Sequence, residues 1–373
     1  MRILLISDPP AAPGYLPRLR YFCDYLTRQG HDVTWLTEEY RALDFGHSYP
    51  IISIPMYSGG IADWALKTAW TLLTDWHNRA FAHRALKELA SQSFDLVLCS
   101  TFSDFPLGAA RRIADFYGLP LICDIRDLDE QVDNSRYQYR HRTWWTMPFR
   151  RLYRAVHIRR RNSVLRTADC LTTVSPWHTA FLQRFNPAVH TIYNGFDEQQ
   201  FYPEDIPSGE FTVTYIGSLF DWQKPWLRLV EEELAAIKAQ HPAFNARLVL
   251  HTPSHDPLPH TALGDAIRRS GIMLVLSGKE THGMLTTKFY EALGCEKPVL
   301  CVPSDEGDLA ELIRYTNAGI ATSDREAIRA FIIEQYRLWC QQSYTRQPTL
   351  HRTTFSRRHQ SEQLMALAAK RFR

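Results

Sequence analysis

The feature that most constrains this chain is a repeated alternation of short apolar runs with longer stretches of helical character. It begins with an apolar run at residues 2–7, followed by a loop that contains Pro and Gly and by a helix that ends before Gly30. Strands that alternate with helices form a parallel, doubly wound sheet, because each helix carries the chain back to the start of the next strand. We expect further strands at 33–36, 51–54, 96–99, 121–124 and 171–174, with helices at 19–29, 66–90 and 107–117.

A polar stretch with two prolines and one glycine, Tyr202–Glu210, interrupts this alternation and predicts a linker. A chain of 373 residues is long enough for two hydrophobic cores. We therefore predict an α/β protein of two Rossmann-like doubly wound parallel-sheet domains, 1–203 and 204–350, and a helix in 351–373 that packs back on the first domain. Ligands are expected in a cleft, at the carboxyl ends of the strands. In the second domain, strands are expected at 211–216, 247–251, 272–276 and 298–302, and the last helices at 324–341 and 355–372.

Charge and cysteine content narrow the class of protein. The net charge is only +3, so any function that depends on basic residues must be local. The seven cysteines are scattered without a CxxC pair, which disfavours a disulfide framework or a zinc site and favours a reducing cytosol. The apolar start is too short for a signal peptide, and no run of about 18 apolar residues could span a bilayer. These features predict a cytoplasmic protein.

The strongest functional signal is the segment that runs from Gly283 to Leu300. A loop with a glycine opens a helix on which Lys288 and Glu291 are three residues apart and therefore share one face. Free backbone N–H groups at such a helix start suit a diphosphate, a lysine adds positive charge, and a carboxylate one turn later can accept hydrogen bonds from ribose hydroxyls. The alternative is a surface Glu/Lys pair on an ordinary helix, and composition alone does not decide between them.

This segment resembles the donor-binding helix of the GT-B-fold family 4 glycosyltransferases, especially those of bacterial capsule, lipopolysaccharide and exopolysaccharide biosynthesis. Their pattern is roughly G-x-x-x-x-K-x-x-E-x-x-x-x-x-x-P-V/I. The resemblance implies that Glu291 binds the ribose and that the loop with Gly283, Leu285, Thr286 and Thr287 meets the phosphates. Classical members carry a second glutamate where this chain has Gly283.

Two more motifs agree with this resemblance. Tyr215-Ile-Gly217-Ser218-Leu219 with Lys224 resembles the G-x-L…K stretch that opens the second domain, and it implies that Gly217, Ser218 and Lys224 contact the donor, with Lys224 on the diphosphate. Ser218 replaces a frequent arginine, and the alternative for Lys224 is a solvated lysine. Asn194-Gly-Phe-Asp197, followed by Phe201 and Pro203, resembles the family's NGxDxxxFxP, although Asn-Gly is also a common turn dipeptide.

On the acceptor side, Asp124-Ile-Arg126-Asp127-Leu128 ends an expected strand and resembles the D-x-R-D-L segment of capsule-type members. The resemblance implies that Asp127 orients or deprotonates the acceptor and that Arg126 binds its anionic part. The alternative is a structural salt bridge between Asp124 and Arg126. Gly14, Arg18 and Asp124 are expected to bind the acceptor as well.

We expect no metal cofactor. Asp127-Leu128-Asp129 spells a DxD, which in other proteins holds a metal-bound nucleotide, but it lies in the wrong half of the chain for the donor. The resemblance implies a mechanism that uses a helix dipole and a lysine in place of a metal. Only about 20 residues separate His251 from Ile272, where classical members have a further strand and helix, so the base cannot be assigned and both UDP- and GDP-linked donors remain open.

A basic segment from Arg136 to Arg166 contains ten arginines, two histidines and no acid. A helix is expected after Thr146, with Pro148 near its first turn. Aromatic and basic side chains in the membrane interface would explain this mixture. The alternatives are a core-packed helix with a solvated basic face, and RNA binding, which we disfavour. The residues expected to contact the membrane are Trp144, Trp145, Phe149, Arg150 and Arg151.

Together these features predict a metal-independent glycosyltransferase of the EC 2.4 class, with the acceptor in the first domain and the nucleotide-sugar in the second. The acceptor is expected to be a lipid-linked saccharide of cell-surface polysaccharide synthesis, and the protein to be peripheral on the inner face of the cell membrane. Family precedent favours retention of the anomeric configuration. Two alternatives stay open: another GT-B nucleotide-sugar enzyme, such as an epimerase or hydrolase, and a catalytically silent nucleotide-binding relative.

Overall fold

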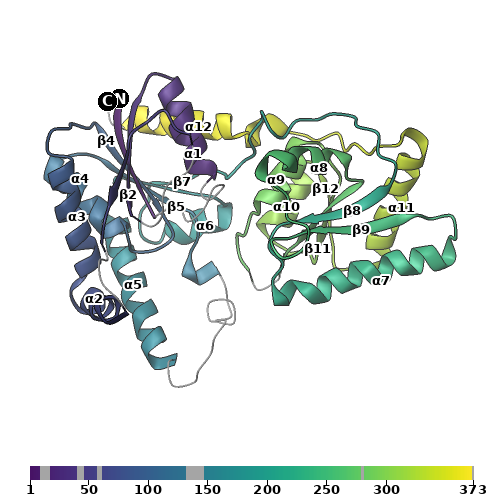
Figure 1. Cartoon of the computed structure of the whole chain (residues 1–373), viewed down its shortest axis with the longest axis horizontal. Coiled ribbons are helices and arrows are strands. Elements are labelled where there is room, and N and C mark those ends of the chain that lie inside the picture. The colour runs from purple at the N-terminus through teal and green to yellow at the C-terminus, as the bar shows by residue number, and fades with distance from the viewer. Residues whose placement is uncertain (9–16, 40–45, 57–60, 132–146, 279–280, 372–373) are drawn as a thin grey trace. The chain divides into compact units, whose positions relative to one another are not determined.

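The computed structural model describes residues 1–8, 17–39, 46–56, 61–131, 147–278 and 281–371, except for the side chains of 61–65, 147–150 and 371. The chain divides into two compact units (Figure 1). Unit 1 comprises residues 1–192 and 363–373, and unit 2 comprises residues 193–362. The boundary differs from the predicted 203/204 because Phe196 and Phe201 are buried in the core of unit 2. Residues 204–210 therefore lie inside unit 2 and do not link the units.

In the described part of unit 1, seven parallel strands form one sheet in the order β3-β2-β1-β4-β5-β6-β7. The first strand pairs with β2 on one side and with β4 on the other, which is the doubly wound arrangement that the sequence predicts. The strands are β1 (Arg2–Ser7), β2 (Asp32–Glu38), β3 (Ile51–Ile54), β4 (Leu96–Thr101), β5 (Leu121–Ile125), β6 (Cys170–Thr173) and β7 (Val189–Thr191).

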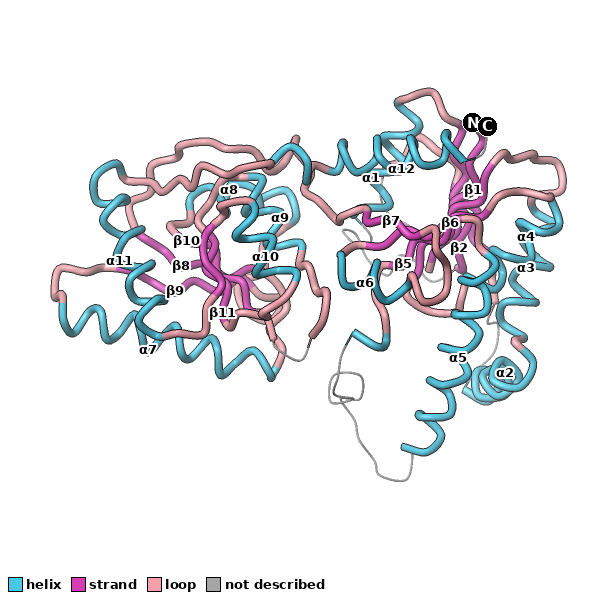
Figure 2. The backbone as a smooth tube through the Cα atoms, turned by 180° about the vertical axis from the view of Figure 1, so that it is seen from behind, coloured by secondary structure: helices cyan, strands magenta, loops and turns pink. Residues whose placement is uncertain are grey.

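Helices cover both faces of this sheet (Figures 1 and 2). Successive side chains of a strand point to opposite faces, so Ile3 and Leu5 pack on one face while Leu4 and Ile6 pack on the other. Leu364 and Ala368 pack on the same face as Ile3 and Leu5, which places the end of the last helix in unit 1. The first face carries α1 (Pro17–Arg28) and the end of α12 (Arg357–Arg371), and the second carries α3 (Trp76–Glu88), α4 (Leu107–Tyr117), α5 (Met147–Thr167) and α6 (Pro176–Leu182).

The single helix predicted over 66–90 is two helices, α2 (Ile61–Thr74) and α3. Asp75 separates them with a φ of 59°, in the left-handed region that Asp tolerates better than most residues. Its carboxylate accepts a hydrogen bond from Asn78 Nδ2 at 2.8 Å and pairs with Arg112 at 3.2 Å. These contacts hold the break between the two helices in place.

In the described part of unit 2, five parallel strands form a second sheet, in the order β12-β11-β10-β8-β9. One face packs on α7 (Lys224–Gln240) and α11 (Arg325–Gln342), and the other on α8 (Leu263–Arg269), α9 (Thr287–Gly294) and α10 (Asp308–Tyr315). Between β9 and β10 the chain forms only one turn of 3-10 helix and α8, so this connection is as short as the sequence indicates. The strands are β8 (Phe211–Ile216), β9 (Ala246–His251), β10 (Ile272–Leu276), β11 (Val299–Val302) and β12 (Gly319–Ala321).

Within the residues that the structure describes, no helix has the length and hydrophobicity needed to cross a bilayer.

Candidate functional site

Two of the predicted donor motifs meet at the carboxyl edge of the sheet in unit 2. Gly217 directly follows β8, and its φ of 117° is readily adopted only by glycine. A Cβ atom at this position would lie 2.8 Å from Lys288 Cε and 3.0 Å from Lys288 Nζ. The absence of a side chain at Gly217 therefore allows the lysine of α9 to lie against the loop that follows β8.

The start of α9 has a side-chain cap that takes up one of its backbone donors. Thr286 caps the helix, and its side chain accepts a hydrogen bond from the backbone N–H of Lys288 at 3.2 Å. Gly283 has a φ of 62° in the loop before the cap. Leu285 is 5% exposed and packs in the core of unit 2, so only its backbone can reach a ligand. N–H groups in the first turn of a helix have no partner within the helix, and they attract anions.

Lys288 and Glu291 both lie partly exposed on this helix. Burial lowers the pKa of Lys288, and the charge of Glu291 opposes that shift. Burial also raises the pKa of Glu291, against the charges of Arg357 and Lys288. The Lys288 ammonium group lies 5.3 Å from the centroid of the Tyr215 ring, within the range of a cation–π contact. For both groups, burial therefore outweighs the attraction between the two charges.

Arg357, at the start of α12, belongs to this site and was missed by the sequence analysis. Its side chain is 4% exposed, and its charge acts on Glu291. Its backbone N–H donates to the carbonyl of Phe196 at 2.8 Å, and a Cβ at Gly195 would come within 2.7 Å of the Phe355 carbonyl oxygen. The Asn-Gly-Phe-Asp motif therefore holds the segment that carries Arg357 in place. No local pattern links Arg357 to Glu291, because they lie far apart in sequence.

Ser218 lies exposed on the loop after β8, and Lys224 lies exposed at the first residue of α7. Lys224 Nζ forms an ion pair with Asp221 Oδ1 at 2.8 Å, so a donor phosphate would have to replace that carboxylate. Gln223 fixes the loop, since its side chain accepts from the backbone N–H of Phe220 at 3.0 Å and donates to the carbonyl of Leu276 at 2.9 Å. The predicted donor residues thus lie on the loop after β8, at the start of α7, and at the start of α9 with the loop before it.

In unit 1, Asp124 lies in a buried polar network. Its carboxylate accepts hydrogen bonds from Arg18 Nη1 at 2.6 Å, from Ser100 Oγ at 2.6 Å and from Thr172 Oγ1 at 2.7 Å. Burial would raise the pKa of Asp124, but the Arg18 charge and these hydrogen bonds hold it below its ordinary value. Arg18 also donates to the carbonyl of Ile192 at 2.9 Å. This arrangement favours a structural role for Arg18 and Asp124 over the predicted contact with an acceptor.

The alternative salt bridge between Asp124 and Arg126 is wrong. Arg126 pairs with Asp8, the residue that directly follows β1. Burial raises the pKa of Asp8, and the charge of Arg126 and a hydrogen bond from Thr101 oppose that shift. Asp127 is exposed. Asp8 could have been identified from its place at the end of the first strand, where ligands of parallel sheets bind.

A second cluster of polar and charged side chains at this edge contains His157 of α5. Its Nδ1 contacts the carboxylate of Asp104, which lies in the loop after β4 and is 2% exposed. Its ring centroid lies 3.9 Å from that of Tyr153. Burial raises the pKa of Asp129, against the charges of Arg154, Arg161 and His157. The sequence analysis counted His157 only as part of the basic segment.

Some arginines of the basic segment are structural, so the alternative of a helix with a wholly solvated basic face does not hold for them. Arg161 is 1% exposed and binds both carboxylate oxygens of Glu130, at 2.6 and 3.0 Å. Arg160 caps the end of α2. Arg151 is exposed. Three predicted site residues lie outside the described residues: Gly14, Trp144 and Trp145. For Phe149 and Arg150, the structure describes only the helical backbone.

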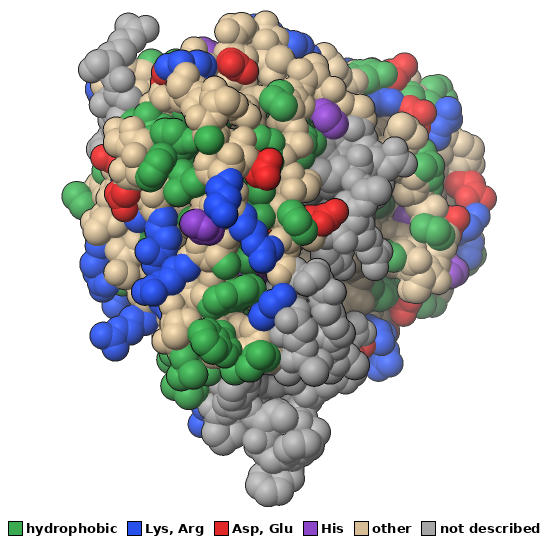
Figure 3. Space-filling view, turned by 60° about the vertical axis from the view of Figure 1, so that its left-hand side comes forward, with side chains coloured by type: hydrophobic (Ala, Val, Ile, Leu, Met, Phe, Trp, Pro, Cys, Tyr) green, Lys and Arg blue, Asp and Glu red, His purple; other side chains and the backbone are tan. Residues whose placement is uncertain are grey.

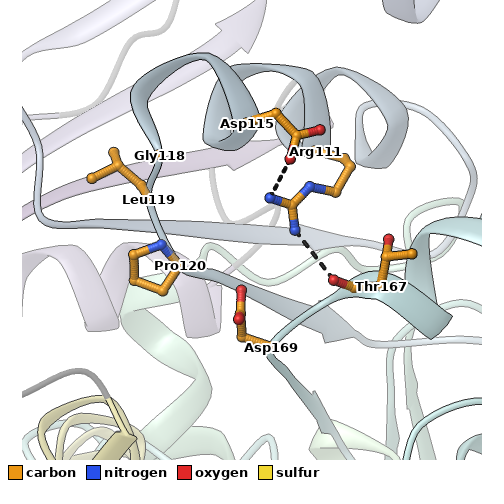
Figure 4. Close-up of a pocket in the computed structure, with 7 residues that line it drawn as sticks. All are labelled: Arg111, Asp115, Gly118, Leu119, Pro120, Thr167 and Asp169. Atoms are coloured by element: carbon orange, nitrogen blue, oxygen red, sulfur yellow. Dashed lines mark hydrogen bonds and ion pairs between the residues drawn. The ribbon is translucent and has the colours of Figure 1, made fainter.

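The pocket in Figure 4 is not part of either candidate site. It lies at the amino ends of β5 and β6, the edge of the sheet opposite to that where ligands of doubly wound sheets bind. Arg111 in this pocket pairs with Asp115 at 2.7 Å and donates to the carbonyl of Thr167 at 3.3 Å. Asp169 accepts from the backbone N–H of Leu121 at 2.8 Å. Both charged groups thus make contacts within the fold.

Residues 18–200, just under half of the chain, match the model of the family described as Glycosyltransferase Family 4. The match covers most of unit 1 and ends shortly after the Asn-Gly-Phe-Asp motif, so the donor segments of unit 2 lie beyond it. It supports glycosyl transfer as the activity. A search of curated proteins finds no match.

Solved structures resemble the chain over its whole length. Sucrose-phosphate synthase from Thermosynechococcus elongatus has a TM-score of 0.66 at 16% identity, with 99% of each chain covered. HepE from Anabaena, in complex with UDP-glucose, has a TM-score of 0.61 at 13% identity, with 99% of this chain and 100% of that chain covered. A protein described as a UDP-N-acetylglucosamine 2-epimerase from Listeria monocytogenes has a TM-score of 0.58 at 11% identity, with 100% and 97% covered. At these identities the likeness shows the fold, and the predicted GT-B class is confirmed.

Proposed function

We propose that this chain is a metal-independent glycosyltransferase that moves a sugar from a nucleotide-sugar to a lipid-linked saccharide in cell-surface polysaccharide synthesis. The observation that carries the proposal is the approach of Lys288 to Gly217, because it joins the loop after β8 to the start of α9 beside Glu291. The family match over residues 18–200 supports the same activity independently. The UDP-glucose complex of the HepE structure supports a nucleotide-sugar as donor.

On the donor side, Glu291 accepts hydrogen bonds from the ribose hydroxyls in this proposal. The backbone N–H of Thr287 and the loop before it bind the diphosphate, and the side chains of Lys288 and Lys224 balance its charge. The bond between the anomeric carbon and the diphosphate oxygen breaks, and the leaving diphosphate gains negative charge. Fixed donors and cations that meet this charge lower the barrier because they need no reorganisation during the reaction. The cations of the chain take the role that a metal ion has in other transferases.

On the acceptor side, an acceptor hydroxyl forms the new bond to the anomeric carbon and gives up its proton. Asp127 is exposed at the carboxyl edge of the sheet in unit 1, and it is our candidate for orienting this hydroxyl or taking the proton. Arg126 would bind an anionic part of the acceptor while Asp8 holds its guanidinium group. His157 with Asp104 is a second candidate base, because a carboxylate beside an imidazole orients the ring for proton transfer.

In this proposal the protein works in the cytoplasm, on the inner face of the cell membrane. Contact with the membrane by Trp144, Trp145, Phe149, Arg150 and Arg151 would bring unit 1 to a lipid-linked acceptor. The arginine at the end of this series, Arg151, is exposed on α5.

The test is incubation of the purified protein with radiolabelled nucleotide-sugars and a membrane extract. Label in the lipid fraction is the expected result. Hydrolysis or isomerisation of the donor without transfer would replace the proposal with another nucleotide-sugar enzyme. Binding of a nucleotide without turnover of any donor would instead indicate a catalytically silent relative, which the replacements at Gly283 and Ser218 would explain.

A further inference from the structure

Asp127, the residue that we propose to act on the acceptor hydroxyl, lies between two residues that the fold holds in place. Before it, the backbone N–H of Arg126 donates to the carbonyl of Thr101 at 3.2 Å, at the end of the pairing between β4 and β5. After it, Leu128 is 3% exposed and packs in the core of unit 1. Asp127 is exposed between these two anchors, so its position depends on how firmly both are held.

A chain of buried hydrogen bonds from α6 reaches the second anchor. Gln131 is the last residue of a short 3-10 helix, η1 (Asp129–Gln131), and its side-chain oxygen accepts from the backbone N–H of Leu128 at 3.1 Å. The same oxygen lies 2.8 Å from His178 Nε2. His178 Nδ1 lies 2.7 Å from the hydroxyl oxygen of Ser175, which caps α6 and also accepts from the backbone N–H of His178 at 3.2 Å. All three side chains belong to buried residues.

These contacts allow only one arrangement of the protons. Gln131 must present its amide oxygen, because a backbone N–H donates to it, and an amide oxygen only accepts. His178 therefore carries a proton on Nε2 and donates it to Gln131. Burial lowers the pKa of His178 to about 4, so at neutral pH the ring is uncharged and has a single N–H. Its Nδ1 then accepts from the Ser175 hydroxyl, and each contact in the chain joins a donor to an acceptor.

Two arginines of α5 hold the same turn from another side. Figure 3 shows Lys and Arg side chains spread over the surface of unit 1. Arg161 differs from these, because it is 1% exposed and binds both carboxylate oxygens of Glu130. Arg154 donates to the backbone carbonyl of Asp129 at 2.8 Å. Helix α5 thus holds two residues of η1, and the chain from α6 holds the third and, with it, the backbone of Leu128.

We propose that His178 is a positioning residue of the acceptor site, which acts through Gln131 to fix the backbone beside Asp127. A group that acts on a substrate has to be held within about 0.5 Å of its productive position, and buried hydrogen bonds behind it are one means of doing so. His178 is 1% exposed and does not touch the acceptor, so it affects the rate of transfer and not the binding of the donor. The inference rests on the proposed function, because it takes Asp127 as the group that acts on the acceptor.

The test compares two variants of His178 in the assay with radiolabelled nucleotide-sugar and membrane extract. In His178→Gln, the side-chain amide nitrogen can take the place of Nε2 and donate to Gln131, whereas His178→Leu has no donor. His178→Leu should lower turnover at saturating donor by roughly 10- to 100-fold, because a small displacement of an acting group has effects of this size. The nucleotide Kd should stay unchanged, and His178→Gln should recover most of the turnover.

Asn186→Leu is the matched control. Asn186 is 5% exposed, and its side chain donates to the carbonyls of Leu165 at 3.0 Å and Ala168 at 2.7 Å, at the amino edge of the same sheet. The control and His178→Leu should both have a lower urea midpoint, but the folded control should turn over at the wild-type rate. Equal losses of turnover in the two variants, or a loss that His178→Gln does not recover, would overturn the inference.

The proton arrangement can be measured without an activity assay. Nuclear magnetic resonance of the protein with isotope-labelled histidine should show, at neutral pH, a neutral ring with its proton on Nε2 that is absent from His178→Gln. A signal with the proton on Nδ1 would contradict the chain and overturn the inference while the transferase activity stands. A wild-type protein that shows the expected signal but transfers no sugar to any acceptor would overturn the proposed function, and the role of His178 with it.

Discussion

The carboxyl edges of the two sheets hold their charged groups in different ways. In unit 1, the carboxylate of Asp124 accepts three side-chain hydrogen bonds, and these bonds with the Arg18 charge hold its pKa below the ordinary value in spite of burial. In unit 2, Glu291 has a raised pKa and Lys288 a lowered one, both chiefly through burial. The first arrangement stabilises the fold, whereas the second is the one that we propose for donor binding. Within unit 1, the buried Asp124 therefore has a structural role, and Arg126 and Asp127 are the residues that we propose for the acceptor.

The largest expected effect tests the structural side of this comparison. Asp124→Ala leaves Arg18 buried without its partner, and loss of one member of a buried ion pair costs about 3–5 kcal/mol of unfolding free energy. Urea denaturation should show the loss as a lower midpoint. If the midpoint stays the same and acceptor use falls instead, Asp124 is a binding residue and the comparison fails.

Glu291→Ala tests the binding side. The fold should persist, because the carboxylate is partly exposed, and nucleotide affinity should fall by roughly 1.5–3 kcal/mol of charged hydrogen bonding. Thermal shifts with UDP, GDP, dTDP and CMP measure the affinity and also identify the base, since a bound ligand raises the melting temperature. An affinity within twofold of the wild type would remove Glu291 from the donor site.

Lys224→Ala should have a smaller effect, with a different signature. Its ammonium group already has Asp221 as a partner, so it adds little to binding of the nucleotide in the ground state. It would act mainly as charge develops on the leaving diphosphate, and kcat should fall on the order of tenfold while the nucleotide Kd changes less. Equal losses in both would make it a binding residue only. No loss in either would exclude it from the site.

Much of the fold was predictable, and the exceptions have physical causes. The strands β1, β8 and β10 have the predicted bounds, because each is a compact apolar run between polar or breaker residues. The strands β7 and β12 were missed, since each has three residues and lies at the edge of its sheet. The break at Asp75 was missed because apolar spacing continues across it, and only its positive φ separates the helices.

The candidate site was predictable where local motifs define it. The approach of Gly217 to Lys288 follows from the rule that ligand sites form at carboxyl edges. The pairs Arg18–Asp124 and Arg126–Asp8 were not predictable, because 106 and 118 residues separate their members and no local pattern encodes them. The sequence motif around Arg126 suggested a partner two residues away, whereas the partner, Asp8, follows β1, which β4 separates from β5 in the sheet.

The pH dependence of nucleotide binding tests whether the Glu291 carboxylate binds the nucleotide in its charged form. Because burial raises the pKa of Glu291, the carboxylate should become protonated at a higher pH than an exposed glutamate. Affinity should therefore be constant above this raised pKa and fall as the pH drops through it, since only the charged form is a strong acceptor. Glu291→Gln should bind more weakly at neutral pH and lack this step. An identical pH profile for both proteins would assign the titration to the nucleotide phosphates.

The smallest expected effect is that of metal removal. It tests whether the cationic side chains of the protein can balance the charge of the diphosphate without a metal ion. In the proposed donor site, Lys288 lies in the first turn of α9 and Lys224 lies at the start of α7. If these groups balance the diphosphate, excess EDTA should leave the transfer rate unchanged, and added Mg²⁺ or Mn²⁺ should not raise it. A rate that collapses in EDTA and returns with Mn²⁺ would point to Asp127-Leu128-Asp129 as a metal site. Asp129→Asn, assayed with and without Mn²⁺, would then separate a ligand from a bystander, because only a ligand changes the metal concentration needed for half-maximal rate.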